Sequence, residues 1–351
     1  MNIPAQDWEE TYESERNRLI EALGHVVDGG IVEAIQHMGA TSVPGLYGSP
    51  CVDIGLTVWP FPLEAGPKSR LEALGYQVLA GYEEGPEQRF RHHSGSFQLY
   101  LMEAGSERWL DQVLVRDYLR HNHVACEDVS LKKRNALLDK SQLFENILPA
   151  ARQWWIGHHQ FAPVEAVAGE LKDVSFPWYI SSGWALDLFL GRVHRVHHDV
   201  DVVVPRSDQM ELHSHFTGRG WRFVTPFEKR LEVWPPHMQL ELPRHQVHAH
   251  RGDDFIDFLL TDMDDVWKYR RELSIVRSLE RTGLRTESGI PYLSPELVLL
   301  FKSKNTSNQE RLKDQSDFER TLPHLEPERR AWLRWALVAT SPEHPWLEQL
   351  A

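Results

Sequence analysis

Two aspartates with the spacing of a metal site, Asp199 and Asp201, lie in a valine-rich run near the middle of the chain. If this run is a strand, both carboxylates project from one face, because side chains alternate along a strand. Paired carboxylate oxygens suit Mg²⁺, which commonly binds one or two carboxylates together with the phosphates of a substrate. The alternative that the spacing leaves open is a strand with two solvated acids.

A turn that contains serine and glycine precedes these aspartates. Ser181, Ser182 and Gly183 lead into a segment whose apolar residues have helical spacing. The free N–H groups at a helix N-terminus readily bind phosphate. We therefore expect one unit over residues 180–204 to supply both the N–H groups that bind a phosphate and the ligands of a metal. This unit consists of a strand end, a turn, a helix and a second strand.

A motif within this unit resembles a known family. It consists of Gly183-Trp184-Ala185-Leu186-Asp187, then Gly191-Arg192, Arg195 and His198-Asp199-Val200-Asp201. The pattern resembles the minimal nucleotidyltransferases, in particular the aminoglycoside- and lincosamide-modifying branch, over about residues 165–340. The resemblance implies Mg²⁺ at Asp199 and Asp201 and an NTP, ATP by default, as co-substrate. It also implies a set of nucleotide-binding residues: Ser181, Ser182, Gly183, Arg195 and His198.

Two of these assignments have alternatives. The family usually has Gly-Gly or Gly-Ser before the helix, whereas this chain has Ser181-Ser182. A serine still offers a hydroxyl and an N–H to a phosphate, so this departure is compatible with activity. His198 is equally compatible with an ordinary loop histidine.

The resemblance implies a third acid on a later strand, which completes the metal site and serves as general base. Asp257 is the expected residue, because apolar residues flank it and a buried carboxylate needs a cation or hydrogen bonds. Asp254 is the second choice and is expected to be a solvated strand start. The catalytic and metal-binding set is therefore Asp199, Asp201 and Asp257.

Further nucleotide-binding residues are expected near the C-terminal end. Ser294 and Pro295 have the pattern of a helix start. Lys302 and Lys304 resemble the helix lysines of this branch that meet nucleotide phosphates. The segment from Arg311 to Asp317 matches the family pattern R-x-K-D-x-x-D. For Lys304 an amphipathic helix with paired charges is an equal alternative.

The N-terminal half carries a second motif, His37-Met38-Gly39-Ala40-Thr41-Ser42-Val43-Pro44-Gly45-Leu46, followed by Asp53 in a strand-like run. It resembles the GrpB (UPF0157) family over about residues 5–145, and the resemblance implies a second nucleotidyltransferase fold. Gly55 stands where an acidic partner of Asp53 would be, and residues 97–101 offer no third ligand. We interpret this half as a binding or scaffolding domain. His37, Thr41 and Ser42 either grip a phosphate or only cap a turn.

The two halves have comparable spacing, since Gly39 precedes Asp53 by fourteen residues and Gly183 precedes Asp199 by sixteen. The predicted fold class is therefore α/β (α+β), with two tandem nucleotidyltransferase-like domains, each a small mixed sheet flanked by helices. The expected domains are residues 1–150 and residues 165–351, the second closed by C-terminal helices. Helices are expected over residues 7–24, 207–216 and 326–347.

The composition and net charge limit the classes of molecule that this chain is expected to bind. The chain has 351 residues, 41% hydrophobic and 25% charged, which is long enough for two domains. A formal net charge of −13 argues against broad nucleic-acid binding. Two cysteines exclude a disulfide framework, and no apolar run reaches membrane-spanning length. The default expectation is a cytoplasmic protein.

The sequence thus predicts a Mg²⁺-dependent nucleotidyltransferase, which moves an NMP from an NTP to a hydroxyl of a small, for example aminoglycoside-like, acceptor. Catalysis is expected in the C-terminal half. One alternative is a non-catalytic, nucleotide- or ligand-binding regulatory protein. Another is a toxin–antitoxin-type nucleotidyltransferase that acts on a macromolecule. The acceptor, the base preference and the oligomeric state stay open.

Overall fold

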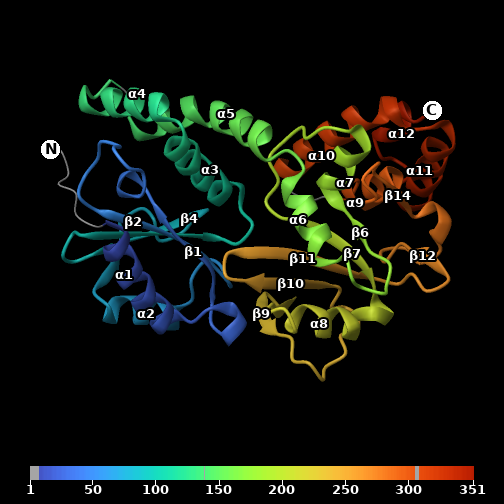
Figure 1. Ribbon diagram of the computed structural model, residues 1–351, viewed down its shortest axis with the longest axis horizontal. Coiled ribbons are helices and arrows are strands. Elements are labelled where there is room, and N and C mark those ends of the chain that lie inside the picture. Colours follow the sequence, from blue (N-terminus) through green and yellow to red (C-terminus); the bar gives the residue numbers. More distant parts are fainter. Residues whose placement is uncertain (1–7, 138, 305–307) are drawn as a thin grey trace. The chain divides into compact units, whose positions relative to one another are not determined.

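The computed structural model describes residues 8–137, 139–304 and 308–351, without the side chains of residues 140 and 308–311. The chain divides into two compact units. The first contains Met1–His158 and Val224–Trp234, and the second contains His159–Phe223 and Pro235–Ala351. Each unit combines helices with a sheet of mixed strand direction (Figure 1).

The first unit is built on a five-stranded sheet with the strand order β1-β2-β5-β4-β3. Strands β2 and β5 are parallel, and the neighbouring strands β1 and β4 run antiparallel to them. Its elements are α1 (Trp8–Leu23), η1 (Val26–Asp28), β1 (Val32–Met38), η2 (Ala40–Ser42), β2 (Val52–Val58), α2 (Ala65–Ala73), β3 (Tyr76–Val78), β4 (Glu87–His92), β5 (Phe97–Glu103), α3 (Glu107–His121), α4 (His123–Arg134) and α5 (Lys140–His159).

Apolar side chains from α1 and the central strands form the core of the first unit. Leu19, Ile54 and Leu99 are fully buried there, and Phe90 packs with them. Helices α1 and α2 lie on one face of the sheet and α3 on the other (Figure 1). Both faces of β2 are therefore covered, and every residue of this strand except Asp53 is buried.

The second unit contains most of an eight-stranded sheet in the order β14-β15-β6-β7-β11-β10-β8-β9. Strands β7 and β11 are parallel, and β6 and β10 flank them in antiparallel orientation. The elements along residues 162–349 are α6 (Ala162–Glu170), β6 (Tyr179–Ile180), α7 (Ser182–Leu190), β7 (Asp201–Pro205), η3 (Arg206–Asp208), α8 (Gln209–Thr217), β8 (Arg222–Phe227), β9 (Arg230–Val233), β10 (Gln246–Arg251), β11 (Asp254–Thr261), β12 (Val266–Lys268), β13 (Val276–Ser278), η4 (Leu279–Arg281), β14 (Gly283–Arg285), β15 (Pro291–Leu293), α9 (Pro295–Lys302), α10 (Asn308–Thr321), η5 (Leu322–His324), α11 (Pro327–Thr340) and α12 (Trp346–Gln349). Of these, β9 and most of β8 fall in Val224–Trp234, the segment that belongs to the first unit.

The two sheets share one topology. The order β1-β2-β5-β4-β3 of the first corresponds strand by strand to β6-β7-β11-β10-β8 in the second. In both, the second and third strands of this order are parallel and the first runs antiparallel. The predicted fold class, two tandem mixed α/β domains, is confirmed.

Packing in the second unit fixes the strands that carry the acidic residues. Phe216 of α8 meets Phe258 of β11 edge-on, with ring centroids 5.0 Å apart, and both rings are fully buried. Helix α7 contacts α9 and α10, so the turn before α7 faces residues from the C-terminal helices. No helix in the described ranges is long and apolar enough to cross a membrane.

Two local expectations need correction. Strand β7 begins at Asp201, so Asp199 lies in the loop that leads into the strand. The predicted closing helix over residues 326–347 is divided into α11 and α12 by a turn that contains Pro345. In contrast, Ser294 is the N-cap of α9 and Pro295 its first residue, as predicted.

Candidate active site

Three carboxylates meet where β7 and β11 lie side by side. Asp199, Asp201 and Asp257 each place a carboxylate oxygen within 4.8 Å of the others. Asp201 and Asp257 are register partners in the parallel pair, and the N–H of Asp257 donates to the carbonyl oxygen of Val200 at 3.2 Å. We call these three residues the carboxylate triad. Side-by-side strands bring together acids that lie more than fifty residues apart in sequence.

The electrostatics of the triad disfavour three negative charges without a cation. Burial, reinforced by the charge of Asp201, raises the pKa of Asp199 from 3.8 to about 7. Burial also raises the pKa of Asp201, although a hydrogen bond from Ser182 and the Lys302, Arg195 and Lys313 charges oppose the rise. Closely spaced acids that resist ionisation are typical of a site that binds a cation.

The third member of the triad is buried and held by a hydrogen bond. Asp257 is 4% exposed, and its Oδ2 accepts from Nε2 of Gln246 at 2.5 Å. Asp254, the second choice for this role, is exposed at the start of β11 and pairs with Arg251 at 3.1 Å. The two acids therefore lie in different environments on one strand, as expected.

The start of α7 has an unusual backbone conformation at Ser182 and close side-chain neighbours at Gly183. Ser182 has φ +51°, the left-handed region that side chains rarely adopt. A Cβ on Gly183 would lie 2.0 Å from Nη2 of Arg195 and 2.6 Å from Cε1 of His197. Only glycine leaves room for these two side chains. Ser181 is 5% exposed and does not line the cavity; its N–H donates to the carbonyl oxygen of Asp201 at 2.8 Å.

A cavity of about 200 Å³ opens beside the triad. Of the residues predicted from the sequence, Ser182, Gly183, Arg195, His198, Asp199, Asp201 and Lys302 line it. Sequence reasoning assigned no role to the other lining residues, which are His197, Lys313 and Asp314. The same small cavity is therefore lined both by carboxylates and by three cations, Arg195, Lys302 and Lys313.

A buried network behind the cavity holds the loop that carries Arg195. Asp187 of α7 is 3% exposed and accepts from His197 Nε2 and from His194 Nδ1, each at 2.8 Å. The ring of His197 stacks on Trp184 with centroids 4.2 Å apart. Burial lowers the pKa of His197 to about 4, so the imidazole is neutral near pH 7. The helix residues of the motif thus position the loop before the triad.

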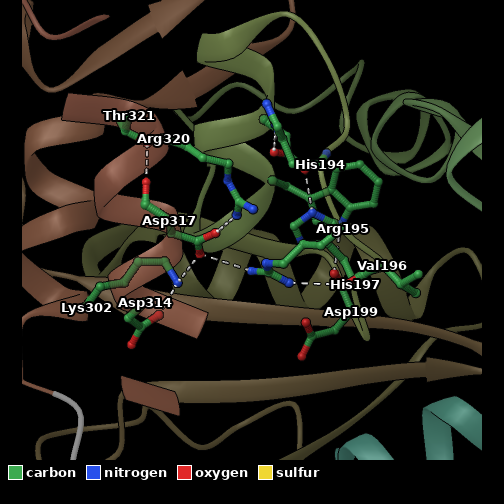
Figure 2. A network of polar contacts seen from close by, with 12 residues as sticks. His194, Arg195, Val196, His197, Asp199, Lys302, Asp314, Asp317, Arg320 and Thr321 are labelled. Carbon is green, nitrogen blue, oxygen red and sulfur yellow. Dashed lines mark hydrogen bonds and ion pairs between the residues drawn. The ribbon is translucent and has the colours of Figure 1, made fainter. Parts of the chain in front are cut away.

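Two of these cations, Lys302 and Arg195, form ion pairs with acids from α10 (Figure 2). Nζ of Lys302 lies 2.5 Å from Oδ1 of Asp314 and 2.9 Å from Oδ2 of Asp317. Nη2 of Arg195 lies 3.4 Å from that same Asp317 oxygen. The signal for these acids was the R-x-K-D-x-x-D pattern, whose i, i+3 spacing puts Asp314 and Asp317 on one helix face.

Lys304 is a correction to the predicted site. It does not line the cavity, and its Nζ donates to the carbonyl oxygen of Thr340 at 2.7 Å and also to the hydroxyl of Ser341. It therefore anchors the end of α11 through a carbonyl and a hydroxyl, which is neither the predicted phosphate contact nor the alternative of paired charges on a helix. The side chain of Arg311, the first residue of the pattern, lies outside the described residues.

The first unit has the same strand register but lacks acids at the two positions that correspond to Asp201 and Asp257. Gly55 pairs with Tyr100 across the parallel strands β2 and β5, as Asp201 pairs with Asp257. The hydroxyl of Tyr100 donates to Oδ1 of Asp53 at 3.2 Å. A Cβ on Gly55 would lie 2.8 Å from the Trp109 ring, so this position has no room for a carboxylate. Among the described residues, no cluster of three metal-ligand side chains lies within the first unit alone.

Family comparisons match the two halves separately. Residues 2–146 match the family model described as GrpB protein, and residues 163–319 match aminoglycoside-2''-adenylyltransferase. A UPF0157 protein of Streptomyces coelicolor is 34% identical over 113 residues, which is 32% of this chain and 56% of that protein. UPF0157 protein YqkA of Bacillus subtilis is 29% identical over 140 residues, 37% of this chain and 38% of that protein. The chain thus spans only part of these relatives.

Two solved structures are similar to parts of the chain. GrpB from Enterococcus faecalis is 22% identical, with a TM-score of 0.37, and the match covers 42% of this chain and 93% of that one. ANT(2'')-Ia in complex with adenylyl-2''-tobramycin is 18% identical, with a TM-score of 0.28, and the match covers 54% and 91%. As both motifs predicted, the chain joins an N-terminal region similar to the GrpB family to a C-terminal region similar to the aminoglycoside-2''-adenylyltransferase family.

Proposed function

We propose that the second unit transfers an NMP from an NTP, ATP by default, to a hydroxyl of a small acceptor, with Mg²⁺ as cofactor. The observation that carries this proposal is the carboxylate triad beside a cavity lined by Arg195, Lys302 and Lys313. A nucleotide site needs acids that bind a metal ion and cations that offset the negative charge of the phosphates. The family match of residues 163–319 supports the same activity.

The triad has the donor chemistry for Mg²⁺. All three ligands are carboxylates, and hard oxygen ligands are the type that Mg²⁺ prefers. The raised pKa values of Asp199 and Asp201 reflect acids that a divalent cation would stabilise in the ionised form. When bound there, Mg²⁺ would polarise phosphoryl oxygens and neutralise charge that develops on them.

The protein's own groups then have separate roles. Asp257 would accept the proton of the acceptor hydroxyl, and its hydrogen bond from Gln246 orients the carboxylate for that role. Arg195, Lys302 and Lys313 would offset the negative charge of the phosphates. The backbone at Ser182 and Gly183, where α7 begins, would bind a phosphate through N–H groups. Pyrophosphate would leave as the second product.

The charge of the chain bears on the acceptor class. A net charge of −13 favours a small hydroxylated molecule, aminoglycoside-like compounds among them, over a nucleic acid. A cytoplasmic location, where NTPs are available, is part of the proposal. The competing function is that of a non-catalytic nucleotide-binding protein. The N-terminal half favours a non-catalytic role, because Gly55 and Tyr100 stand where the second unit has two acids.

The test has a binding step and a transfer step. ATP and then GTP are titrated calorimetrically with Mg²⁺ into the wild type and into Asp199→Ala/Asp201→Ala. Magnesium-dependent binding that the double variant loses supports the site, whereas binding that survives moves it elsewhere. Transfer is then followed as α-phosphate label on hydroxylated acceptors, together with pyrophosphate release.

Asp257→Asn and Asp254→Asn form a matched pair for the transfer step, because both acids lie on β11. Loss of a general base typically costs about 10²- to 10⁴-fold in rate. We expect that loss in kcat for Asp257→Asn and a normal rate for the exposed Asp254→Asn. Equal rates for the two variants would remove Asp257 from the mechanism.

A further inference from the structure

One buried carboxylate connects two of the three cations that line the cavity. Asp317 of α10 is 4% exposed, and its Oδ2 contacts both Lys302 and Arg195 while its Oδ1 pairs with Arg320 at 2.5 Å. Lys302 is the last residue of α9, and Arg195 lies in the loop before β7. Figure 2 shows Asp317 between these two cations, with Asp199 on the other side of Arg195. A single side chain therefore fixes groups from three segments.

The charge of Asp317 is preserved at neutral pH. Burial alone would raise its pKa, but the Lys302 and Arg195 charges outweigh burial and hold the pKa well below its ordinary value. A buried acid that is ionised in this way is paired by its surroundings rather than solvated. Within the described ranges, every ion pair of Arg195 and Lys302 goes to Asp314 or Asp317, and none goes to the triad.

The absence of those pairs needs an explanation, because opposite charges line one cavity. Burial raises the pKa values of Asp199 and Asp201, but Arg195 opposes both rises and Lys302 opposes that of Asp201, so their charges already act on the triad. A direct salt bridge would neutralise a carboxylate that Mg²⁺ needs. Asp317 supplies a competing anion, and it lies 122 residues from Arg195 in sequence.

We propose that Asp317 is a positioning residue, which holds Arg195 and Lys302 away from the carboxylate triad and thereby keeps the triad open to a divalent cation. Asp314 shares this task for Lys302 only, because its ion pair goes to that lysine. The inference rests on the proposed function in one respect, namely that the triad is the metal site.

The probe is Mn²⁺ without nucleotide, measured by calorimetry and by the EPR signal of free Mn²⁺. In Asp317→Asn we expect Arg195 to turn toward the triad and Mn²⁺ affinity to fall about tenfold, within the coupling range of residues in contact. In Arg195→Gln/Asp317→Asn the competing cation is gone, so affinity should return to that of Arg195→Gln. A purely structural role for Asp317 predicts no such recovery, and its absence overturns the proposal.

Two controls separate positioning from folding. Glu296 is another buried carboxylate paired with arginines, Arg277 and Arg329, and it does not line the cavity. Glu296→Gln should lower Tm and leave Mn²⁺ affinity unchanged. Should Asp317→Asn fail to fold, Arg195→Gln alone still decides. The proposal predicts Mn²⁺ affinity within about threefold of wild type, whereas a gain of tenfold or more would mean that Arg195 already pairs with the triad.

The proposed function fails in a different way. A wild type that binds Mn²⁺ but transfers no nucleotide refutes transferase activity and leaves the Mn²⁺ comparisons valid. A wild type that binds no Mn²⁺ overturns the positioning role and the metal dependence together.

Discussion

Replacement of Gly183 by alanine is the most direct perturbation of the site's framework. This glycine has no left-handed φ, so an alanine backbone fits and the cost comes from collision. The added Cβ would lie 2.0 Å from the Arg195 guanidinium and 2.8 Å from Nδ1 of His197. His197 cannot withdraw easily, because it stacks on Trp184 and donates to Asp187. Arg195 must move, and the 3.4 Å contact with Asp317 is then lost.

The size of the effect follows from two contributions. Overpacking a close-packed site typically costs about 1–3 kcal/mol, and a partly exposed charge-assisted contact adds about 1 kcal/mol. We expect Gly183→Ala to destabilise the second unit by about 2–4 kcal/mol, which lowers its Tm by about 5–15 °C. ATP affinity should fall as well, because Arg195 leaves the cavity lining.

Gly169→Ala is the matched control. Gly169 lies in α6 of the same unit, and nothing is within 4 Å of a Cβ placed there. Alanine has the higher helix propensity, so this variant should be neutral or more stable by about 0.5–1 kcal/mol. Differential scanning calorimetry and ATP titration compare the two. If Gly183→Ala melts and binds like Gly169→Ala, the packing derived for the turn is wrong.

Two further predictions concern the acids. Because burial raises the pKa of Asp199 to about 7, this carboxyl takes up a proton on folding, and its stabilising contribution is complete below its unfolded value near 3.8 and lost as pH rises through 7. Bound Mg²⁺ requires the ionised form, so saturating Mg²⁺ should raise Tm more at about pH 8 than at about pH 5, and a pH-independent increment would contradict this. Gly55→Asp should create no second metal site, because Trp109 lies 2.8 Å from the new Cβ. Calorimetry with Mn²⁺ on that variant in an Asp199→Ala/Asp201→Ala background should show no binding and a lowered Tm, whereas a new Mn²⁺ site would refute the steric reasoning.

The local part of the site was predictable from the sequence. The spacing in the valine-rich run predicted that Asp199 and Asp201 lie close together, although Asp199 precedes the strand, and the serine–glycine turn indicated the start of α7. Both features depend on neighbours within a few residues, where backbone geometry determines where side chains point. The two motifs likewise predicted a fold that the matching strand orders confirm.

Strand register was decided by tertiary structure. Sequence identified Asp257 by its apolar surroundings, yet only the pairing of β11 with β7 puts it beside Asp201. The same register in the first unit puts Tyr100 opposite Gly55, whereas the sequence showed only that Gly55 replaces an acid and that residues 97–101 offer no third ligand. Register between strands depends on packing of whole faces, because a slip of one residue would turn every side chain to the opposite face.

The contacts of Lys302 and Lys304 also show what the sequence determines and what only the folded chain determines. The sequence by itself determined the acid pair, the turn, the two motifs and the helix start at Ser294 and Pro295. Only the folded chain decided that Lys302 contacts Asp317 while Lys304 binds the end of α11. Helix α9 ends at Lys302, so Lys304 lies beyond it, and what each lysine meets depends on segments that pack there from elsewhere in the chain.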